Sequence, residues 1–390
     1  MSDWWAKKLA GETPKQQRPD EIQRRIESQS YTDTQRVQQN KKPREQMSDY
    51  ESLNSIINSI NKKYGENTLI KGSQIAEKVK RVTSGVLAYD LMLGGGWPVN
   101  QWSEIIGEES SGKTALAYKT IAANQAIDPN FTALWIAAEA YVPQYAKAIG
   151  VDLDRLWVVE TNIMEQVYNL IIKSLDNRAV DMIVIDSLPS LVPDDEMERA
   201  MEEFTVGLGA RLTGKFFRKS GKAQRRSLVD EDDRPCTGLV INQWREKIGV
   251  MWGDNRTTPG GKAKNFHYFV RVEVKRDEWL KEKDEVVGQT IKARTIKNKT
   301  YKPQQSAVVD FYFTQSQHFL FGSFDTIKDI VNIGIAINLI ERAGPYYSYM
   351  NQKWQGKDAL IQGVREDMTI QTALRKEAFL YFGVEDEKWD

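Results

Sequence analysis

Apolar residues in the middle of the chain occur in short blocks that alternate with amphipathic stretches. The runs that predict strands are Ser103–Ile106, Ala133–Ala138, Leu156–Val159, Met182–Ile185 and Leu239–Ile241. Apolar residues recur with helical spacing at 114–125, 164–176 and 207–219. Strands that alternate with helices predict an α/β fold, in which a mostly parallel sheet is flanked by helices on both faces.

Beyond residue 267 the spacing changes to a period of two. Val270, Val272 and Val274 alternate with polar residues, and the runs Val286–Ile296 and Ala307–Phe313 follow. This pattern predicts antiparallel strands that extend the same sheet. The chain then turns helical again at Phe324–Leu339 and Ile370–Phe382, around Tyr346, Tyr347 and Tyr349. We therefore expect a core at 84–322 and a small C-terminal α/β domain at 323–390.

The N-terminal region has a different composition. Residues 1–47 are mostly polar and charged, which predicts a disordered extension. The pair Trp4 and Trp5 at its tip is either a sticky end or a short docking peptide for a partner. Apolar residues then recur at helical spacing from Leu53 to Tyr64, after Ser48 or Asp49 as a cap. We expect this helix, in a segment at 48–83, to pack on the chain's own core or on a neighbouring subunit.

Composition excludes several classes of protein. Lys and Arg number 54, as do Asp and Glu, so the net charge of zero gives no global case for nucleic-acid binding. The single Cys236 excludes an internal disulfide framework. His267 and His318 are far apart with no cysteine beside them, which argues against a zinc site. No apolar run reaches the ~18 residues of a membrane span, and we expect a cytoplasmic protein that does not use a membrane.

A phosphate-binding motif stands between a predicted strand and a predicted helix. Its residues fit the pattern GxxxxGK[ST] and read Gly107, Glu108, Glu109, Ser110, Ser111, Gly112, Lys113 and Thr114. Glycines let the backbone wrap around an anion, so that N–H groups and the helix N-terminus face a phosphate. Lys113 can reach the β- and γ-phosphates and the Thr114 hydroxyl can hold Mg²⁺. The motif predicts a site for a nucleoside triphosphate.

Two carboxylates follow predicted strands at the edge where this motif lies. Asp186 ends the apolar run from Val180, and an acid there normally holds Mg²⁺ through water. Glu139 follows the strand ending at Ala138 and can orient the attacking water, although position alone also fits a solvated loop acid. Tyr145 is a candidate to stack on the base of the nucleotide, or an ordinary packing residue.

At this point the chain resembles the bacterial RecA-type homologous recombinases, from about Leu53 to about Arg365. Besides Gly107–Thr114 and Asp181–Ser187, the resemblance is carried by Ile241–Gly253, Thr257–Gly261, Lys297–Lys299 and Glu341–Tyr349. The first two motifs occur in many ATPases. The combination of Asn242-Gln243, Gly260-Gly261 and Lys297-Asn298-Lys299 is specific to this family. The resemblance implies a RecA-like P-loop NTPase core that uses ATP and Mg²⁺.

The resemblance also implies roles for individual residues. Glu139 corresponds to the catalytic glutamate, and Gln243 to the residue that senses the γ-phosphate and passes its presence to the DNA-binding loop. Lys297 and Lys299 correspond to the pair that reaches the ATP of the next subunit, where they neutralise charge that develops in phosphoryl transfer. Without the resemblance, Lys-Asn-Lys at a strand end would indicate only a solvated basic turn.

Two loops are the candidate DNA-binding segments. Basic residues there can neutralise phosphates while apolar side chains insert between bases, a mode that suits single strands. The candidates in and after the first loop are Arg199, Val206, Gly207, Arg211 and Arg218. The candidates in the second loop are Arg245, Lys247, Ile248, Gly249, Met251, Trp252, Arg256, Gly260, Gly261 and Lys262.

The chain departs from the family pattern at several positions. Ala137 replaces a common acid two residues before Glu139, and an acidic contact to adenine is missing. Lys262 stands where the family has Asn, and the charged stretch at 222–233 has no counterpart. These departures and the extra N-terminus suggest a divergent member; a phage origin, with a phage-infected host as its location, is one hypothesis.

The most specific function that follows is that of an ATP-dependent recombinase. Such a protein assembles as a helical filament on single-stranded DNA, hydrolyses ATP between subunits and exchanges strands with homologous double-stranded DNA. One alternative is a hexameric helicase on the same fold, which would use an arginine finger in a closed ring. Another is an ATP-gated filament that coats DNA without exchanging strands.

Overall fold

The computed structural model describes residues 46–64, 69–74, 79–198, 207–224, 234–246, 256–316 and 319–384. Trp4, Trp5 and nearly all of the predicted extension lie outside these ranges, as do residues 225–233 of the charged stretch. The described residues up to 74 belong to one compact unit and those from 79 onward belong to a second.

The described part of the first unit comprises the helix α3 (Gln46–Tyr64) and a short 3-10 turn, η1 (Gly72–Gln74). The cap predicted at Ser48 or Asp49 is wrong, because α3 begins at Gln46; Gln and Met are good helix formers that extend it. Leu53 and Ile56 are about half exposed, at 49% and 50%. Within the described residues, the apolar stripe of α3 is therefore left largely uncovered.

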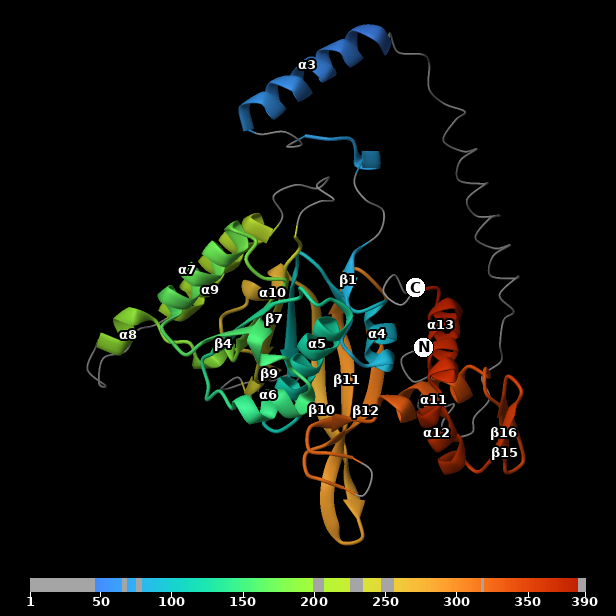
Figure 1. The fold of residues 1–390 in the computed structure, drawn as a ribbon. Helices are drawn as coiled ribbons and strands as arrows, with labels where there is room; N and C mark the ends of the chain where they lie inside the picture. Colours follow the sequence, from blue (N-terminus) through green and yellow to red (C-terminus); the bar gives the residue numbers. More distant parts are fainter. Residues whose placement is uncertain are drawn as a thin grey trace. The chain divides into compact units, whose positions relative to one another are not determined.

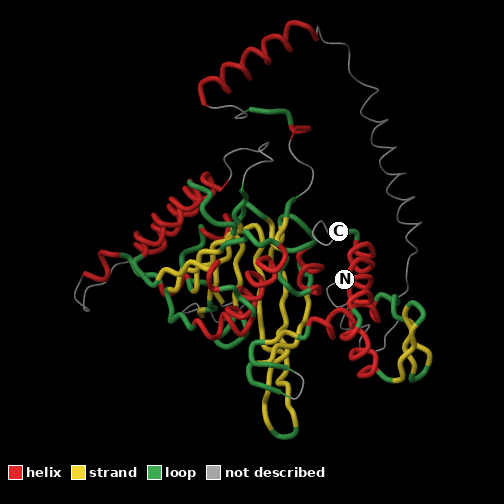
Figure 2. The backbone as a smooth tube through the Cα atoms, in the orientation of Figure 1, coloured by secondary structure: helices red, strands yellow, loops and turns green. Residues whose placement is uncertain are grey.

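The second unit is built on a sheet of nine strands in the order β13-β12-β11-β10-β3-β7-β6-β4-β5. Strands β3 to β7 and β10 are parallel to their neighbours within this part of the sheet, whereas β11 to β13 are antiparallel. The mostly parallel sheet flanked by helices is thus confirmed (Figures 1 and 2). The bounds are β3 Trp102–Ile106, β4 Ala133–Ala137, β5 Leu156–Val159, β6 Met182–Asp186, β7 Thr237–Asn242, β10 Tyr268–Glu282, β11 Glu285–Asn298, β12 Ser306–Tyr312 and β13 Ser323–Phe324.

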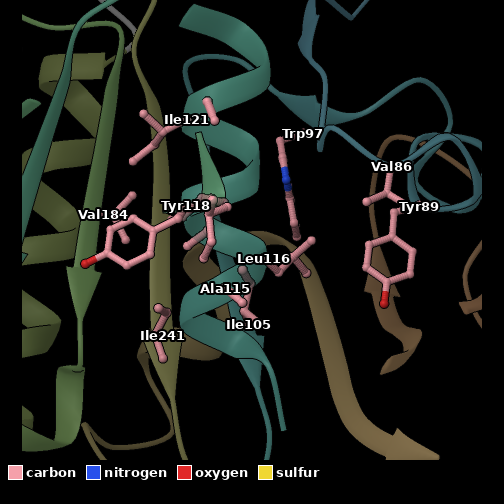
Figure 3. Close-up of a cluster of buried hydrophobic side chains, with 14 of the residues drawn as sticks. Val86, Tyr89, Trp97, Ile105, Ala115, Leu116, Tyr118, Ile121, Val184 and Ile241 are labelled. Carbon is pink, nitrogen blue, oxygen red and sulfur yellow. The ribbon is translucent and has the colours of Figure 1, made fainter. Parts of the chain in front are cut away.

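Helices cover both faces of this sheet, because each strand sends alternate side chains into two apolar layers. Ile105 and Val184 pack on the face of α5, whereas Trp102 and Ile183 pack on the opposite face with α7 and α9. Figure 3 shows Leu116 and Ile121 of α5 among the first group. The helices are α4 Leu87–Leu93, α5 Lys113–Ile127, α6 Pro143–Ile149, α7 Met164–Asp176, α8 Asp194–Glu198, α9 Leu208–Gln224 and α10 Lys264–His267, with 3-10 turns η2 Leu153–Arg155 and η3 Leu188–Ser190.

The C-terminal region combines helices with a small sheet. Its helices are α11 Thr326–Ala336, α12 Lys357–Glu366 and α13 Met368–Phe382, and its strands are β14 Glu341–Ala343, β15 Tyr346–Tyr349 and β16 Gln352–Gln355. The tyrosines noted in the sequence form β15, which periodicity did not locate because the strand is only four residues long. Asp329 of α11 accepts a hydrogen bond from the Ala88 backbone of α4 at 3.0 Å, and Arg375 of α13 lies 3.4 Å from Asp90. These contacts join the region to the core.

Two short strand pairs complete the second unit. Strand β1 (Arg81–Val82) pairs with β2 (Trp97–Pro98), and β8 (Arg245–Glu246) pairs with β9 (Arg256–Thr257). Among the described residues, no helix is both long and apolar enough to cross a bilayer.

Candidate functional site: a phosphate loop and its surroundings

The phosphate loop joins β3 to α5 at the carboxyl edge of the parallel strands. Ser110 and Gly112 both adopt the left-handed conformation, with φ of 55° and 94°, and Gly112 caps the N-terminus of α5. The hydroxyl of Ser111 is buried and has no hydrogen-bond partner among the described residues. A turn that presents a helix N-terminus and an unsatisfied hydroxyl is suited to bind a phosphate.

Gly107 is confined by the neighbouring strand β10. A methyl group on its Cα would lie 2.3 Å from the carbonyl oxygen of Val274 and 2.6 Å from the Ser111 hydroxyl. The backbone of Val274 is held in the sheet and cannot easily move. The loop therefore follows β10 at a distance that only glycine permits.

We expect Gly107→Ala to destabilise the protein by roughly 1–3 kcal/mol, because the clash with a fixed carbonyl forces the backbone to shift. It should also remove most of the stabilisation that ATP with Mg²⁺ gives, since the shift displaces the loop. Thermal unfolding with and without the nucleotide measures both effects. Gly72→Ala is the control, because nothing lies within 4 Å of the added methyl group. Equal melting temperatures and equal stabilisation by the nucleotide in the two variants would contradict the confinement of Gly107.

Lys113, Thr114 and Asp186 come together beside the loop, as the sequence predicts. The Thr114 hydroxyl donates to Asp186 Oδ2 at 3.0 Å, and the Lys113 ammonium donates to the Glu108 carbonyl at 2.5 Å. Burial raises the pKa of Asp186 to about 6, against the hydrogen bond from Thr114, and burial lowers the pKa of Lys113. A hydroxyl and a carboxylate at hydrogen-bonding distance are oxygen donors that suit Mg²⁺. Within the described ranges, no group of three or more His, Cys, Asp or Glu residues could hold a metal ion.

Glu139 lies at the same edge and is held in a fixed position. Its backbone N–H donates to the Asp186 carbonyl at 3.1 Å, directly after β4. Its carboxylate accepts hydrogen bonds from the hydroxyls of Ser187 and Ser190, the latter at 3.1 Å. The side chain is nevertheless exposed to solvent. An oriented carboxylate that water can reach is the arrangement a general base needs.

Tyr145 on α6 packs between two aromatic rings. Its ring centroid lies 5.9 Å from that of Tyr118, in an edge-on arrangement, and 5.7 Å from that of Phe321. Ala137, the departure from the family pattern, is the buried last residue of β4 and pairs with Asp186. The role of Tyr145 in base stacking stays a prediction.

Gln243 is placed beside the phosphate loop by the register of β3 and β7. Ile106 and Asn242 are partners in this parallel pair, and the Gly107 N–H donates to the Asn242 carbonyl at 3.4 Å. Gln243 follows Asn242 directly, and its N–H donates to the Asn242 side chain at 2.9 Å. A displacement of the phosphate loop can therefore be transmitted to Gln243 through the peptide unit of Asn242.

The candidate DNA-binding residues that are described surround the stem of the second loop. Strands β8 and β9 clamp its two ends, with Arg245 opposite Thr257. A methyl group on Gly261 would lie 3.0 Å from Ala210, so this end packs closely on α9. The exposed candidates are Gly207, Arg211, Arg218, Arg245 and Lys262. The candidates outside the described residues are Arg199, Val206, Lys247, Ile248, Gly249, Met251 and Trp252.

Arg256 differs from the other cations of this loop, because its charge is already engaged. Its guanidinium forms an ion pair with the buried Glu273 at 2.6 Å and lies over the Trp244 ring, 4.6 Å from the centroid. An arginine held on both sides positions the stem of the loop.

Lys297 and Lys299 lie toward the amino ends of the parallel strands, whereas the phosphate loop lies at their carboxyl ends. The Lys299 N–H donates to the Phe269 carbonyl, whereas Ile106, next to the phosphate loop, is opposite Glu273. These two positions on β10 are four residues apart (269 to 273), about 13 Å along the strand at ~3.3 Å per residue. The two lysines therefore do not converge on the phosphate loop of their own chain.

Contacts with α10 hold both lysines. Lys297 Nζ donates to the Asn265 carbonyl at 2.6 Å, and Lys299 Nζ donates to the Phe266 carbonyl at 3.3 Å. Burial, together with the neighbouring Lys299 and Arg271, lowers the pKa of Lys297 to about 8. An anion beside Lys297, such as a triphosphate, would raise this pKa again because it favours the charged form.

Two features of the site were not predicted from the sequence. Glu104 and Lys264 form a fully buried ion pair, although Lys264 follows a stretch that indicates an exposed basic loop. Lys275 and Lys292 are exposed cross-strand partners on β10 and β11. Like charges directly opposite each other are unfavourable, and Glu273 offsets this pair in part, because its carboxylate lies 3.4 Å from the Lys275 ammonium. The alternation of Lys292 and Arg294 along β11 was the signal in the sequence that could have indicated these exposed cations.

Comparison with known proteins identifies similar chains. A family model described as the RecA N-terminal domain matches residues 51–317. A protein of Staphylococcus carnosus (strain TM300) named "Protein RecA" is 35% identical over 345 residues, which cover 86% of this chain and 93% of that protein. "Protein RecA" of Staphylococcus aureus (strains JH9 and Newman) is 33% identical over 338 residues, with the same coverage.

Proposed function

The chain belongs to the RecA family, and from this premise we propose that it is a DNA-dependent ATPase and recombinase. It would assemble with ATP and Mg²⁺ on single-stranded DNA and exchange strands with homologous double-stranded DNA. The observation that carries the proposal is the meeting of three parts at one sheet edge. These are the phosphate loop, the oriented Glu139, and Gln243 at the start of the DNA loop. The hydrogen bond between Gly107 and Asn242 joins the phosphate loop to the residue before Gln243, and Glu139 is bonded to the Asp186 carbonyl.

In this proposal the residues of one protomer bind the triphosphate and prepare the attacking water. The loop N–H groups and Lys113 bind the phosphates, and Thr114 with Asp186 holds Mg²⁺, which shields the charge of the phosphates. Glu139 orients a water in line with the γ-phosphate and accepts its proton. Gln243 changes its position when the γ-phosphate is bound, and the stem of the DNA loop moves with Gln243.

Residues of a neighbouring protomer would complete the site. Lys297 and Lys299 are held away from their own phosphate loop, which supports a role at the ATP of the next subunit. There they would stabilise the charge of the transition state. A contact between two different surfaces of identical subunits gives a filament if the rotation does not close. The uncovered apolar stripe of α3 is the proposed docking element for this contact.

Strand exchange requires two DNA molecules on one assembly. Arg245 and Lys262, at the stem of the loop, would contact the first strand. The exposed Lys292 lies opposite Lys275, whose ammonium is 3.4 Å from Glu273, and these lysines form a second cationic region that would attract the phosphates of the incoming duplex. Two separate cationic regions suit pairing better than simple coating of one strand.

A strand-exchange assay tests this function. Circular single-stranded DNA and a linear duplex are incubated with the protein, ATP and Mg²⁺, and we expect joint molecules only when the two sequences are homologous. A heterologous duplex and the Lys113→Ala variant are the controls. ATP-dependent coating of DNA with no joint molecules would overturn the recombinase proposal in favour of a coating filament. Unwinding of forked duplex without homology would favour a helicase.

A further inference from the structure

Glu104 is a fully buried carboxylate with partners from three different elements. Lys264 Nζ of α10 lies 3.3 Å from Oε1, and Arg271 Nε of β10 donates to Oε2 at 2.6 Å. The side-chain amide of Asn242, on β7, donates to Oε1 at 2.8 Å. Two cations thus share one carboxylate inside the fold. We call Glu104, Lys264, Arg271 and Asn242 the buried cluster.

The buried cluster holds both ends of the DNA loop. Asn242 precedes Gln243 at the first end, and its side-chain amide also donates to the Pro259 carbonyl at the second end, at 3.4 Å. Lys264 donates to the Thr258 hydroxyl at 2.5 Å, again at the second end. Closing a loop at its stem restricts where the loop can point. The stem of the DNA loop is therefore fastened to a single buried charge network.

The same cluster is connected to the phosphate loop. Glu104 lies on β3, three residues before Gly107, and the Asn242 carbonyl accepts the Gly107 N–H. A displacement of the phosphate loop when it binds a triphosphate would pull on β3 and on Asn242 together. Both movements would reach the Glu104 carboxylate, because Glu104 belongs to β3 and accepts a hydrogen bond from the Asn242 side chain.

Helix α10 extends this connection to the lysines that would serve the neighbouring subunit. Lys264 begins α10, and its ammonium also donates to the Asn265 side chain at 2.9 Å. The backbone carbonyls of the next two residues accept from Lys297 and Lys299. A small movement of α10 would therefore change the position of both lysines at once.

We propose that the Lys264–Glu104 pair is a positioning element through which bound DNA regulates ATP hydrolysis. This inference rests on the proposed function. DNA on the loop shifts Thr258 and Pro259, Lys264 follows because it is bonded to Thr258, and α10 then sets Lys297 and Lys299 for the neighbouring site. A buried ion pair is weak evidence for a role in stability, because apolar residues of similar volume often replace such a pair at no cost.

ATP hydrolysis by Lys264→Met, measured with and without saturating circular single-stranded DNA, tests the proposal. Methionine fills a similar volume without the charge, and Arg271 and Asn242 still contact Glu104, so we expect ATP affinity and the DNA-free rate to stay within about twofold of wild type. The melting temperature should fall, because one partner of a buried ion pair is removed. The stimulation by DNA should fall about tenfold or more, within the range of ordinary coupling between sites. Lys173→Met, on the exposed face of α7, is the matched control.

A second variant keeps the test decisive if Lys264→Met does not fold. Thr258→Val preserves shape and removes only the hydroxyl that bonds Lys264, and it should lower the stimulation in the same direction by a smaller factor. If wild type is stimulated by DNA and both folded variants are stimulated equally, the inference is wrong while the proposed function stands. If wild type hydrolyses ATP without any response to DNA, the proposed function itself fails, and this inference fails with it.

Discussion

Glu139→Gln is expected to lower DNA-stimulated ATP hydrolysis by roughly 10²–10⁴-fold, because a general base contributes about that factor. ATP-dependent binding to single-stranded DNA should remain, since glutamine can still accept the hydrogen bonds of Ser187 and Ser190 that orient the side chain. Steady-state phosphate release measures the first effect, and DNA binding by anisotropy at fixed salt measures the second. An effect limited to turnover is what loss of transition-state chemistry produces.

A matched control separates this role from a general loss of charge at the sheet edge. Glu160 is an exposed carboxylate directly after β5, the neighbour of β4, and has no part in the proposed chemistry. Glu160→Gln should therefore leave turnover within about twofold of wild type. Unchanged hydrolysis in Glu139→Gln would place the base elsewhere.

The second large effect concerns the division of the site between two subunits. Glu139→Gln alone and the double variant Lys297→Ala/Lys299→Ala alone should each be nearly inactive, because every interface lacks one half. Mixed in equal amounts on DNA, random head-to-tail assembly should combine intact halves at roughly a quarter of the interfaces. Hydrolysis should return to as much as that fraction of wild type.

A mixture whose two defects lie in the same half is the control for this experiment. In a mixture of Glu139→Gln and Lys113→Ala every triphosphate-binding half is defective, so no interface carries a complete site and no activity should return. Electron microscopy establishes that the variants assemble together. Joint assembly of the first pair without recovered activity would mean that the lysines do not act on a neighbouring subunit.

Local signals in the sequence were enough to predict the parts of the site that depend on fixed spacing. The phosphate loop lies between β3 and α5, as its local motif predicts. Asp186 meets Thr114, 72 residues away in the sequence, because both lie at the carboxyl ends of parallel strands, at the same edge of the sheet. The position of Glu139 followed from the rule that parallel strands share a carboxyl edge, whereas Gln243 was identified through the resemblance. Their roles came from the resemblance and stay predictions.

Features that depend on distant residues could not be predicted in this way. Lys264 is buried only because Glu104, Thr258 and Asn265 supply its hydrogen bonds, and nothing beside it in the sequence indicates this. The engagement of Arg256 depends on Glu273, on another strand. Helix α3 begins at Gln46 because good helix formers precede the residues that resemble a cap. Tertiary partners thus determine the environments of Lys264 and Arg256, whereas local helix propensity determines where α3 begins.

The separation of Lys299 from Gly107 across the sheet has a consequence at the ends of the proposed assembly. A row of n protomers contains n − 1 complete sites, because one terminal subunit offers a triphosphate that no lysines reach and the other offers lysines with nothing to contact. In short rows a larger fraction of the sites would therefore be incomplete. The rate of ATP hydrolysis per protomer would rise with the length of the DNA. One terminal subunit also retains its nucleotide uncleaved, so the two ends of a row differ chemically. That asymmetry gives the assembly a direction in which it can grow and a direction in which it can shrink.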